Sequence, residues 1–108
     1  MSRMVRKSAQ PLLEVFKQML KESGAGTTHN SRRIYSAWDA ASGAGHYTIK
    51  RYYRDGNLYI TTSSSVICSQ LRMQSDALRE KINSILDQDE LVINEEDRPV
   101  RVKNLIIR

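Results

Sequence analysis

Residues 52–65 read "YYRDGNLYITTSSS", and this stretch decides the fold. It holds the pair Asp55-Gly56 between two runs in which polar and apolar residues alternate. A tight primed turn needs positive φ, which Gly56 adopts without steric cost, so the pair predicts a β-hairpin. The two strands are expected at residues 46–54 and 57–62. Three serines follow the second strand, and each can cap the helix that begins there: Ser63, Ser64 and Ser65.

Strand alternation divides the hairpin residues between two faces. In the second strand, Leu58 and Ile60 are expected to point into the core. In the first strand, Ile49 and Tyr53 are expected to do the same, with Arg51 near an open edge or reaching outward along its stem. The opposite, outward face is then predicted to carry Thr48, Lys50, Tyr52, Arg54, Tyr59 and Thr61.

The N-terminal region predicts a short arm and a helix. Residues 1–8 are basic and unpatterned, so we expect a flexible arm there and a single domain over residues 9–108. Ser8 can cap the first helix, and Pro11 is tolerated in its first turn. The helix is predicted to present one apolar stripe made of Leu12, Phe16, Met19 and Leu20.

The remaining elements complete an α+β domain. A second helix is predicted over residues 31–41, capped by Asn30 or Ser31, and a long third helix over about 65–86. An acidic connection with an apolar knot at residues 91–93 leads to a third strand within 100–108. The order α-α-β-β-α-β predicts a small three-stranded sheet covered by helices, which is the element content of KH-like domains. The buried residues are expected to include Trp38, Ile49, Leu58, Ile60, Leu71, Leu78 and Ile82.

Composition favours an anionic partner. The chain has 108 residues, of which 40% are hydrophobic and 27% charged, as in a small globular protein. Residues 1–55 carry a net charge of +6, and residues 56–108 carry −1. A basic half suits nucleic acid, although a basic surface without a partner explains the charge equally well. No apolar run approaches the roughly 18 residues of a membrane span, so we expect no membrane partner and a cytoplasmic location.

Residues that carry enzyme chemistry are sparse. The single Cys68 has no Cys-His motif around it, and His29 and His46 stand apart, so an inert cysteine and no metal site are expected. The glycine pairs lack a P-loop lysine, and no GxxG loop is present to clamp a nucleic-acid backbone. The sequence therefore predicts a non-enzymatic protein without a cofactor or a small-molecule substrate.

The outward face of the hairpin is the predicted binding site. Tyrosines between cationic side chains hold single-stranded nucleic acid by stacking and charge. Tyrosine and threonine are also good strand residues that form cross-strand pairs, so an ordinary sheet surface remains the alternative interpretation. The residues predicted to bind nucleic acid or a partner protein are Lys50, Tyr52, Arg54 and Tyr59, helped by Arg32 and Arg33 at a helix start.

Several segments together resemble the DciA-like family of bacterial domains. They are Trp38 with "SGAGHYTI" (42–49), "RDGNLYITTSSSVICSQLRM" (54–73), "LREKINSIL" (78–86) and "VKNLIIR" (102–108). The resemblance covers about residues 30–108. The positions that match the family pattern are Trp38, Gly45, His46, Thr48, Asp55, Gly56, Leu58, Ser63, Ser64 and Leu71.

The resemblance implies a function in DNA replication. A protein of this family is expected to have a KH-like fold, to bind single-stranded or forked DNA in the nucleoid, and to assist loading of the replicative DNA helicase. It is expected to have no ATPase chemistry, in agreement with the missing P-loop. An RNA-binding or ribosome-associated KH-like module is the alternative, because a basic face with tyrosines does not by itself separate RNA from DNA.

Overall fold

The computed structural model describes residues 2–94 and 99–108. Within them the chain is α+β, as predicted, with one helix more than expected. A short 3₁₀ turn at Gly45–Tyr47 leads from the second helix into the first strand. The elements are α1 (Ser2–Ser23), α2 (Gly26–Ser42), β1 (Thr48–Arg54), β2 (Asn57–Thr62), α3 (Ser65–Met73), α4 (Ser75–Asp87) and β3 (Asn104–Ile107).

The three strands form one sheet in the order β1-β2-β3. β1 and β2 are antiparallel and joined by Asp55 and Gly56, whose φ angles of 52° and 86° are those of the predicted primed turn. β3 lies parallel to β2. A parallel pair needs a long crossover connection, and α3 and α4 belong to that connection. The backbone N–H of Tyr53 in the edge strand β1 donates to the Tyr35 hydroxyl on α2 at 3.1 Å.

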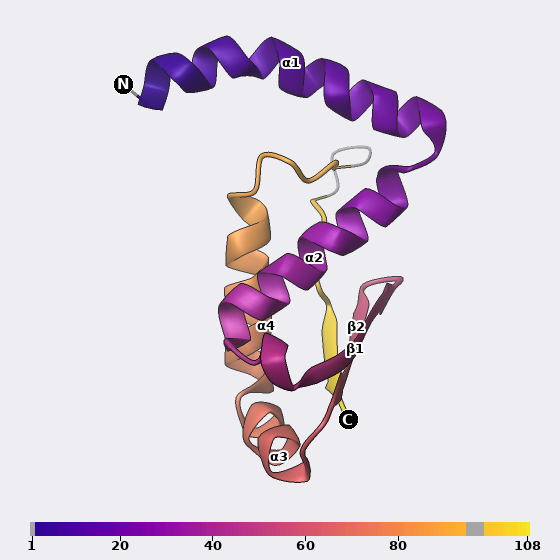
Figure 1. Cartoon of the computed structure of the whole chain (residues 1–108), viewed down its shortest axis with the longest axis vertical. Helices are drawn as coiled ribbons and strands as arrows, with labels where there is room; N and C mark the ends of the chain where they lie inside the picture. Colours follow the sequence, from indigo (N-terminus) through magenta and orange to yellow (C-terminus); the bar gives the residue numbers. More distant parts are fainter. Residues whose placement is uncertain (1, 95–98) are drawn as a thin grey trace.

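The core lies between the sheet and the helices α2 and α4, which cross beside it in Figure 1. Trp38 from α2, Ile60 from β2 and Ile82 from α4 are fully buried there. Gly43, with φ of 63°, ends α2 in the left-handed conformation, so the chain turns directly toward β1. Six of the seven predicted core residues are buried: Trp38, Leu58, Ile60, Leu71, Leu78 and Ile82.

The predicted third helix is two helices that meet at Gln74. Ser64 caps α3 by accepting a hydrogen bond from the N–H of Ile67, which confirms one of the three predicted caps. α3 contacts β2 and β3, whereas α4 packs against α2 and β3. The break gives the two halves separate directions, so that Leu71 and Leu78 both reach the core. Apolar spacing alone does not reveal such a break, because both halves keep a helical period.

The first helix begins earlier than predicted. α1 starts at Ser2, not after Ser8, and Pro11 lies inside it. An interior proline removes one backbone hydrogen bond, yet most residues from Arg3 to Gln10 are good helix formers. α1 packs against α2 and otherwise extends away from the sheet (Figure 1). Three of the four residues of the predicted stripe, Leu12, Phe16 and Met19, are therefore exposed, and Leu20 is half-buried. Val15 of the same helix is also exposed.

Two asparagines hold the segment between α4 and β3. The amide of Asn30 bonds both the N–H and the carbonyl of Ile93 at 2.8 Å, so it does not cap α2, which begins at Gly26. Asn83 bonds the N–H and carbonyl of Val102 in the same way, at 2.7 and 3.0 Å. The predicted apolar knot is buried at Val92 and Ile93. The acidic residues 95–97 lie outside the described residues.

Leu71→Ala tests the core. Leu71 is the buried residue of α3, so truncating it leaves a cavity between this helix and the sheet. We expect the free energy of unfolding to fall by about 2–5 kcal/mol. Urea denaturation measures the loss. The exposed Met73 of the same helix provides the control, because Met73→Ala should leave stability within about 0.5 kcal/mol. Equal stability of the two variants would contradict the core described here.

Candidate nucleic-acid interface

A β-bulge at the start of β1 changes the direction of the first side chains of the strand. Thr48 lies opposite Thr62, but Lys50 lies opposite Thr61, so Ile49 is the extra residue between them. Ile49 is 66% exposed, and its predicted place in the core is wrong. Thr48 points inward, so its predicted place on the outer face is also wrong. A bulge re-aims the side chains before it, which strict alternation does not anticipate.

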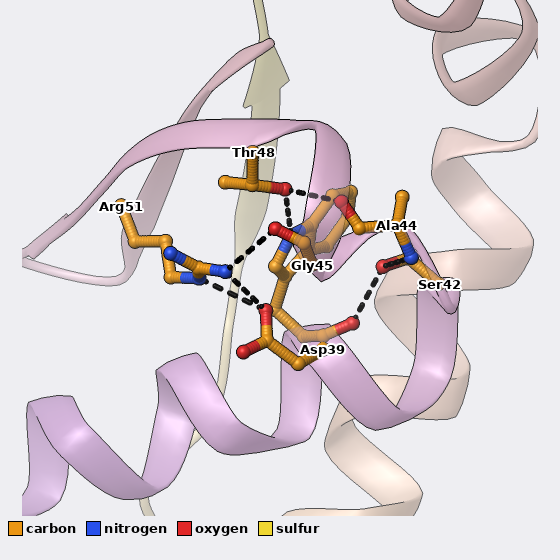
Figure 2. A network of polar contacts seen from close by, with 7 residues as sticks. Asp39, Ser42, Ala44, Gly45, Thr48 and Arg51 are labelled. Atoms are coloured by element: carbon orange, nitrogen blue, oxygen red, sulfur yellow. Dashed lines mark hydrogen bonds and ion pairs between the residues drawn. The ribbon is translucent and has the colours of Figure 1, made fainter. Parts of the chain in front are cut away.

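Thr48 links the start of β1 to α2 (Figure 2). Its hydroxyl accepts a hydrogen bond from the Trp38 indole N–H at 3.0 Å and donates one to the carbonyl of Ala44 at 2.8 Å. Ser42 closes the turn, donating to the Trp38 carbonyl at 2.7 Å and accepting from the N–H of Ala44 at 3.1 Å. These bonds fix the entry of the chain into the sheet.

Arg51 anchors β1 to the same turn. Its guanidinium forms an ion pair with Asp39 at 2.8 Å and donates to the Gly45 carbonyl at 3.3 Å (Figure 2). Arg51 lies opposite Ile60, on the core side of the edge strand. β1 is an edge strand, so the prediction that Arg51 lies near an open edge is confirmed. The charge of Arg51 is balanced within the protein by the Asp39 carboxylate. A Cβ on Gly45 would lie 3.2 Å from the Asp39 carboxylate, so a larger residue at position 45 would require this side chain to shift slightly.

Beyond the bulge, alternate residues of the hairpin form an open groove. Lys50, Tyr52 and Arg54 of β1 face outward opposite Thr61, Tyr59 and Asn57 of β2. We call this surface the hairpin face. Its groove has a volume of about 320 Å³ and is lined by Lys50, Tyr52, Arg54, Tyr59, Thr61 and Arg108. The four predicted hairpin residues are therefore brought together, as expected.

Aromatic rings and cations alternate on the hairpin face. The Tyr52 and Tyr59 rings lie 6.0 Å apart with 35° between their planes, and Tyr52 is 45% exposed. The Arg108 guanidinium lies over the Tyr59 ring, 5.5 Å from its centre. Lys50 makes no ion pair with any described residue, and Arg54 only approaches Asp55 at 3.6 Å, with both side chains largely in solvent. The face therefore carries cations available to an anionic ligand.

Arg32 and Arg33 do not line this groove. They lie within α2, well after its first residue Gly26, so the predicted proximity to a helix start is lost. Arg33 pairs with Asp89 at 2.6 Å, and that carboxylate is only 8% exposed. Arg33 thus joins α2 to the end of α4, while Arg32 is exposed.

Arg108 is a residue of the candidate site that sequence reasoning missed. β3 pairs with β2, so Tyr59 lies opposite Ile106, and the next outward position is Arg108. The backbone of Arg108 is held by hydrogen bonds to Ile60 and Thr62 at 2.8 Å. The sequence predicts a third strand here, but it does not predict which strand pairs with it. Knowing that β3 lies beside β2 would have placed Arg108 on the hairpin face.

Other reactive groups are few in the part of the chain that the structure describes. Cys68 is half-buried against the core. No three His, Cys, Asp or Glu side chains in this part lie together as metal ligands would, and none of its helices is long and apolar enough to cross a membrane. Burial raises the pKa of Tyr53, whose hydroxyl donates to the Arg101 carbonyl at 2.9 Å. Tyr53 faces the core side of β1, away from the groove.

Fold and groove together define a small α+β domain with an uncovered sheet face that is basic and bears tyrosines. A family model described as "Dna[CI] antecedent, DciA" matches residues 11–93, and the chain belongs to this family. The family is linked to loading of the replicative helicase in bacterial DNA replication. No curated protein and no solved structure matches the chain, so the likeness to KH-like domains stays a prediction. The match begins within α1, earlier than the predicted residue 30.

Thr48→Val tests the link between α2 and β1. Valine keeps the shape of threonine but leaves the buried indole N–H of Trp38 without its acceptor, so the free energy of unfolding should fall by about 1–3 kcal/mol. Chemical denaturation measures it. The control is Thr61→Val, which makes the same change on the hairpin face and should be nearly neutral. If both variants unfold alike, the hydroxyl of Thr48 does not hold this junction.

Proposed function

We propose that this protein is a non-enzymatic accessory of DNA replication in the cytoplasm, acting at the nucleoid. It binds single-stranded or forked DNA through the hairpin face, contacts the replicative helicase and assists its loading, and it needs no cofactor. Family membership supports the helicase part of this proposal. The DNA part is supported by one observation above the others, which is that the exposed ring of Tyr52 lies beside Tyr59 in a groove lined by cationic side chains.

The tyrosines suit the bases of a single strand. Every base has a flat face, so stacking on Tyr52 tolerates any sequence and contributes about 1–3 kcal/mol per base. The helices of the core lie on the other side of the sheet, and beside the Tyr59 ring Tyr52 keeps 45% of its surface exposed. A face of this kind fits a protein that meets unwound DNA of arbitrary sequence.

The cations suit the phosphates. Lys50, Arg54 and Arg108 line the groove with the two rings, and no carboxylate lines it. Contacts with phosphates release counterions, so the affinity of such a site falls steeply with salt. Charge gives the groove its attraction for a polyanion, and stacking favours unpaired bases over a closed duplex.

A separate surface suits the helicase. The exposed residues Leu12, Val15, Phe16 and Met19 recur at helical spacing along α1, the helix that extends away from the sheet (Figure 1). An exposed apolar patch of this kind marks contact with another protein. We therefore propose that the helicase contacts α1 and that DNA contacts the sheet. Helicase binding measured on the variants below shows whether the hairpin face also contributes to the helicase contact.

Tyr52→Ala tests stacking. We expect it to weaken binding of a fluorescent single-stranded oligonucleotide by about 1–3 kcal/mol, which is about fivefold to 150-fold, with little change in stability. Fluorescence anisotropy reads the affinity. Tyr47→Ala is the matched control, because Tyr47 has nearly the same exposure, 44%, but lies outside the groove. A Tyr52→Ala protein that binds as well as the parent would remove the hairpin face as the DNA site, and lost helicase binding alone would give the face to the helicase.

Lys50→Ala tests the charge. The plot of log affinity against log salt should become shallower by about 0.7, the value for one lost phosphate contact with a single strand. Lys21→Ala, which removes an exposed lysine from α1, should leave the slope unchanged. The same titration with an RNA oligonucleotide decides the alternative function. Clearly tighter binding of RNA than of DNA would favour an RNA-binding module over a replication accessory.

A further inference from the structure

A second groove lies beside the hairpin face. It has a volume of about 610 Å³ and runs between β3 and the first turns of α4. Arg79 of α4 and Lys103, which precedes β3, line it, and Arg79 donates to the Lys103 carbonyl at 3.5 Å. Asn57 and Asn104 bond to each other at 2.9 Å on its floor. We call this surface the β3 groove.

The two grooves adjoin each other. Tyr59 and Arg108 line both of them, so a ligand that extends from one groove into the other would contact these two residues, and we call this place the passage. Tyr59 belongs to the central strand β2 and Arg108 follows the edge strand β3. The combined surface therefore crosses all three strands, a distance of about 10 Å between the outer strands, and ends at α4.

The charge of the combined surface is strongly positive. Five cations line it, Lys50 and Arg54 in the hairpin face, Arg79 and Lys103 in the β3 groove, and Arg108 between them. Asp76 is the one carboxylate among the lining residues. A surface with this excess selects a chain with repeated negative charges, not a single small anion.

We propose that one single strand of nucleic acid runs across the sheet, from the hairpin face over Tyr59 and Arg108 into the β3 groove. This inference rests on the proposed DNA binding and adds its path and its second half. Bases stack at Tyr52, and the backbone continues toward Arg79 and Lys103. The strand thus lies transverse to the β-strands.

Arg108 is the central contact on this path. Its backbone is fixed by three hydrogen bonds to β2 residues, two of them to Thr62, while its side chain extends over the Tyr59 ring. A guanidinium that stacks on a ring keeps its N–H groups free at the edge to bind phosphate. Arg108 can therefore hold the backbone at the passage without giving up its contact with Tyr59.

A length series of oligothymidylates tests the path. Oligomers from about 4 to about 16 nucleotides span the site sizes of small single-strand-binding domains. The variants are Arg79→Gln, Lys103→Gln and Arg108→Gln. Each substitution removes a positive charge and keeps most of the aliphatic part of the side chain. Lys81→Gln is the control, since Lys81 is exposed on α4 and lines neither groove. Thermal unfolding of each variant verifies the fold.

The path predicts a dependence on length. Arg108→Gln should lower the salt slope by about 0.7 for every oligomer, the value for one phosphate contact with a single strand. Lys103→Gln and Arg79→Gln should lower the salt slope only for the longer oligomers, because the shortest oligomers are bound on the hairpin face alone. Lys81→Gln should bind like the parent at all lengths.

The outcomes separate this inference from the proposed function. If Lys103→Gln and Arg79→Gln match Lys81→Gln at every length while Tyr52→Ala binds weakly, the path is wrong and the hairpin face stands. If the parent binds no oligomer even at low salt, both the path and the proposed DNA binding fail. Loss of helicase binding by the β3-groove variants, with oligomer binding intact, would also overturn the path, because the groove would then receive protein.

Discussion

Trp38 is wholly buried, and its indole N–H needs an acceptor inside the protein, because an unpaired buried donor costs about 1–3 kcal/mol. Thr48 supplies that acceptor only if β1 contains a bulge, since strict alternation would turn its hydroxyl outward. The bulge exposes Ile49, so the protein loses the roughly 1.5–3 kcal/mol of stabilisation that burying this side chain would contribute. The two costs are similar, and the further bond from Thr48 to Ala44 favours the bulged arrangement. The bulge lies before Lys50, so the outward residues of the hairpin face keep the alternation that the turn sets, while the start of β1 is fixed to α2.

Much of the fold could be predicted because its signals are local. The primed turn at Asp55-Gly56 requires only two residues, and β2 alternates without interruption, so its bounds and its buried residues Leu58 and Ile60 are as expected. The errors arise where a distant partner decides the outcome. Asn30 looks like a helix cap from its neighbours, but Ile93 takes both of its hydrogen bonds, and the break at Gln74 depends on what α3 and α4 pack against.

The candidate site likewise contains some residues that the sequence places correctly and others that only the fold places. Lys50, Tyr52, Arg54 and Tyr59 share a face because they alternate along two strands joined by a short turn, and sequence is sufficient to see this. Nothing in the sequence around Arg33 and Arg108 distinguishes the two arginines, and only the fold shows that their contacts differ. Arg33 is neutralised by Asp89, 56 residues away, whereas Arg108 reaches Tyr59 because β3 lies beside β2. Charge counted along the chain cannot separate a structural cation from one that faces a ligand.

The hydrogen bond from the Tyr53 N–H to the Tyr35 hydroxyl has a consequence for self-association. An edge strand normally offers a row of unpaired backbone groups, and another chain can add a strand there and begin to aggregate. On β1 one of these amides is already occupied by a side chain from α2, and the bulge at Ile49 distorts the row a few residues earlier. A foreign strand would find neither a straight edge nor a complete set of donors. The protein can therefore leave the tyrosine-bearing face of its sheet open to solvent while the β1 edge resists the addition of a strand from another copy.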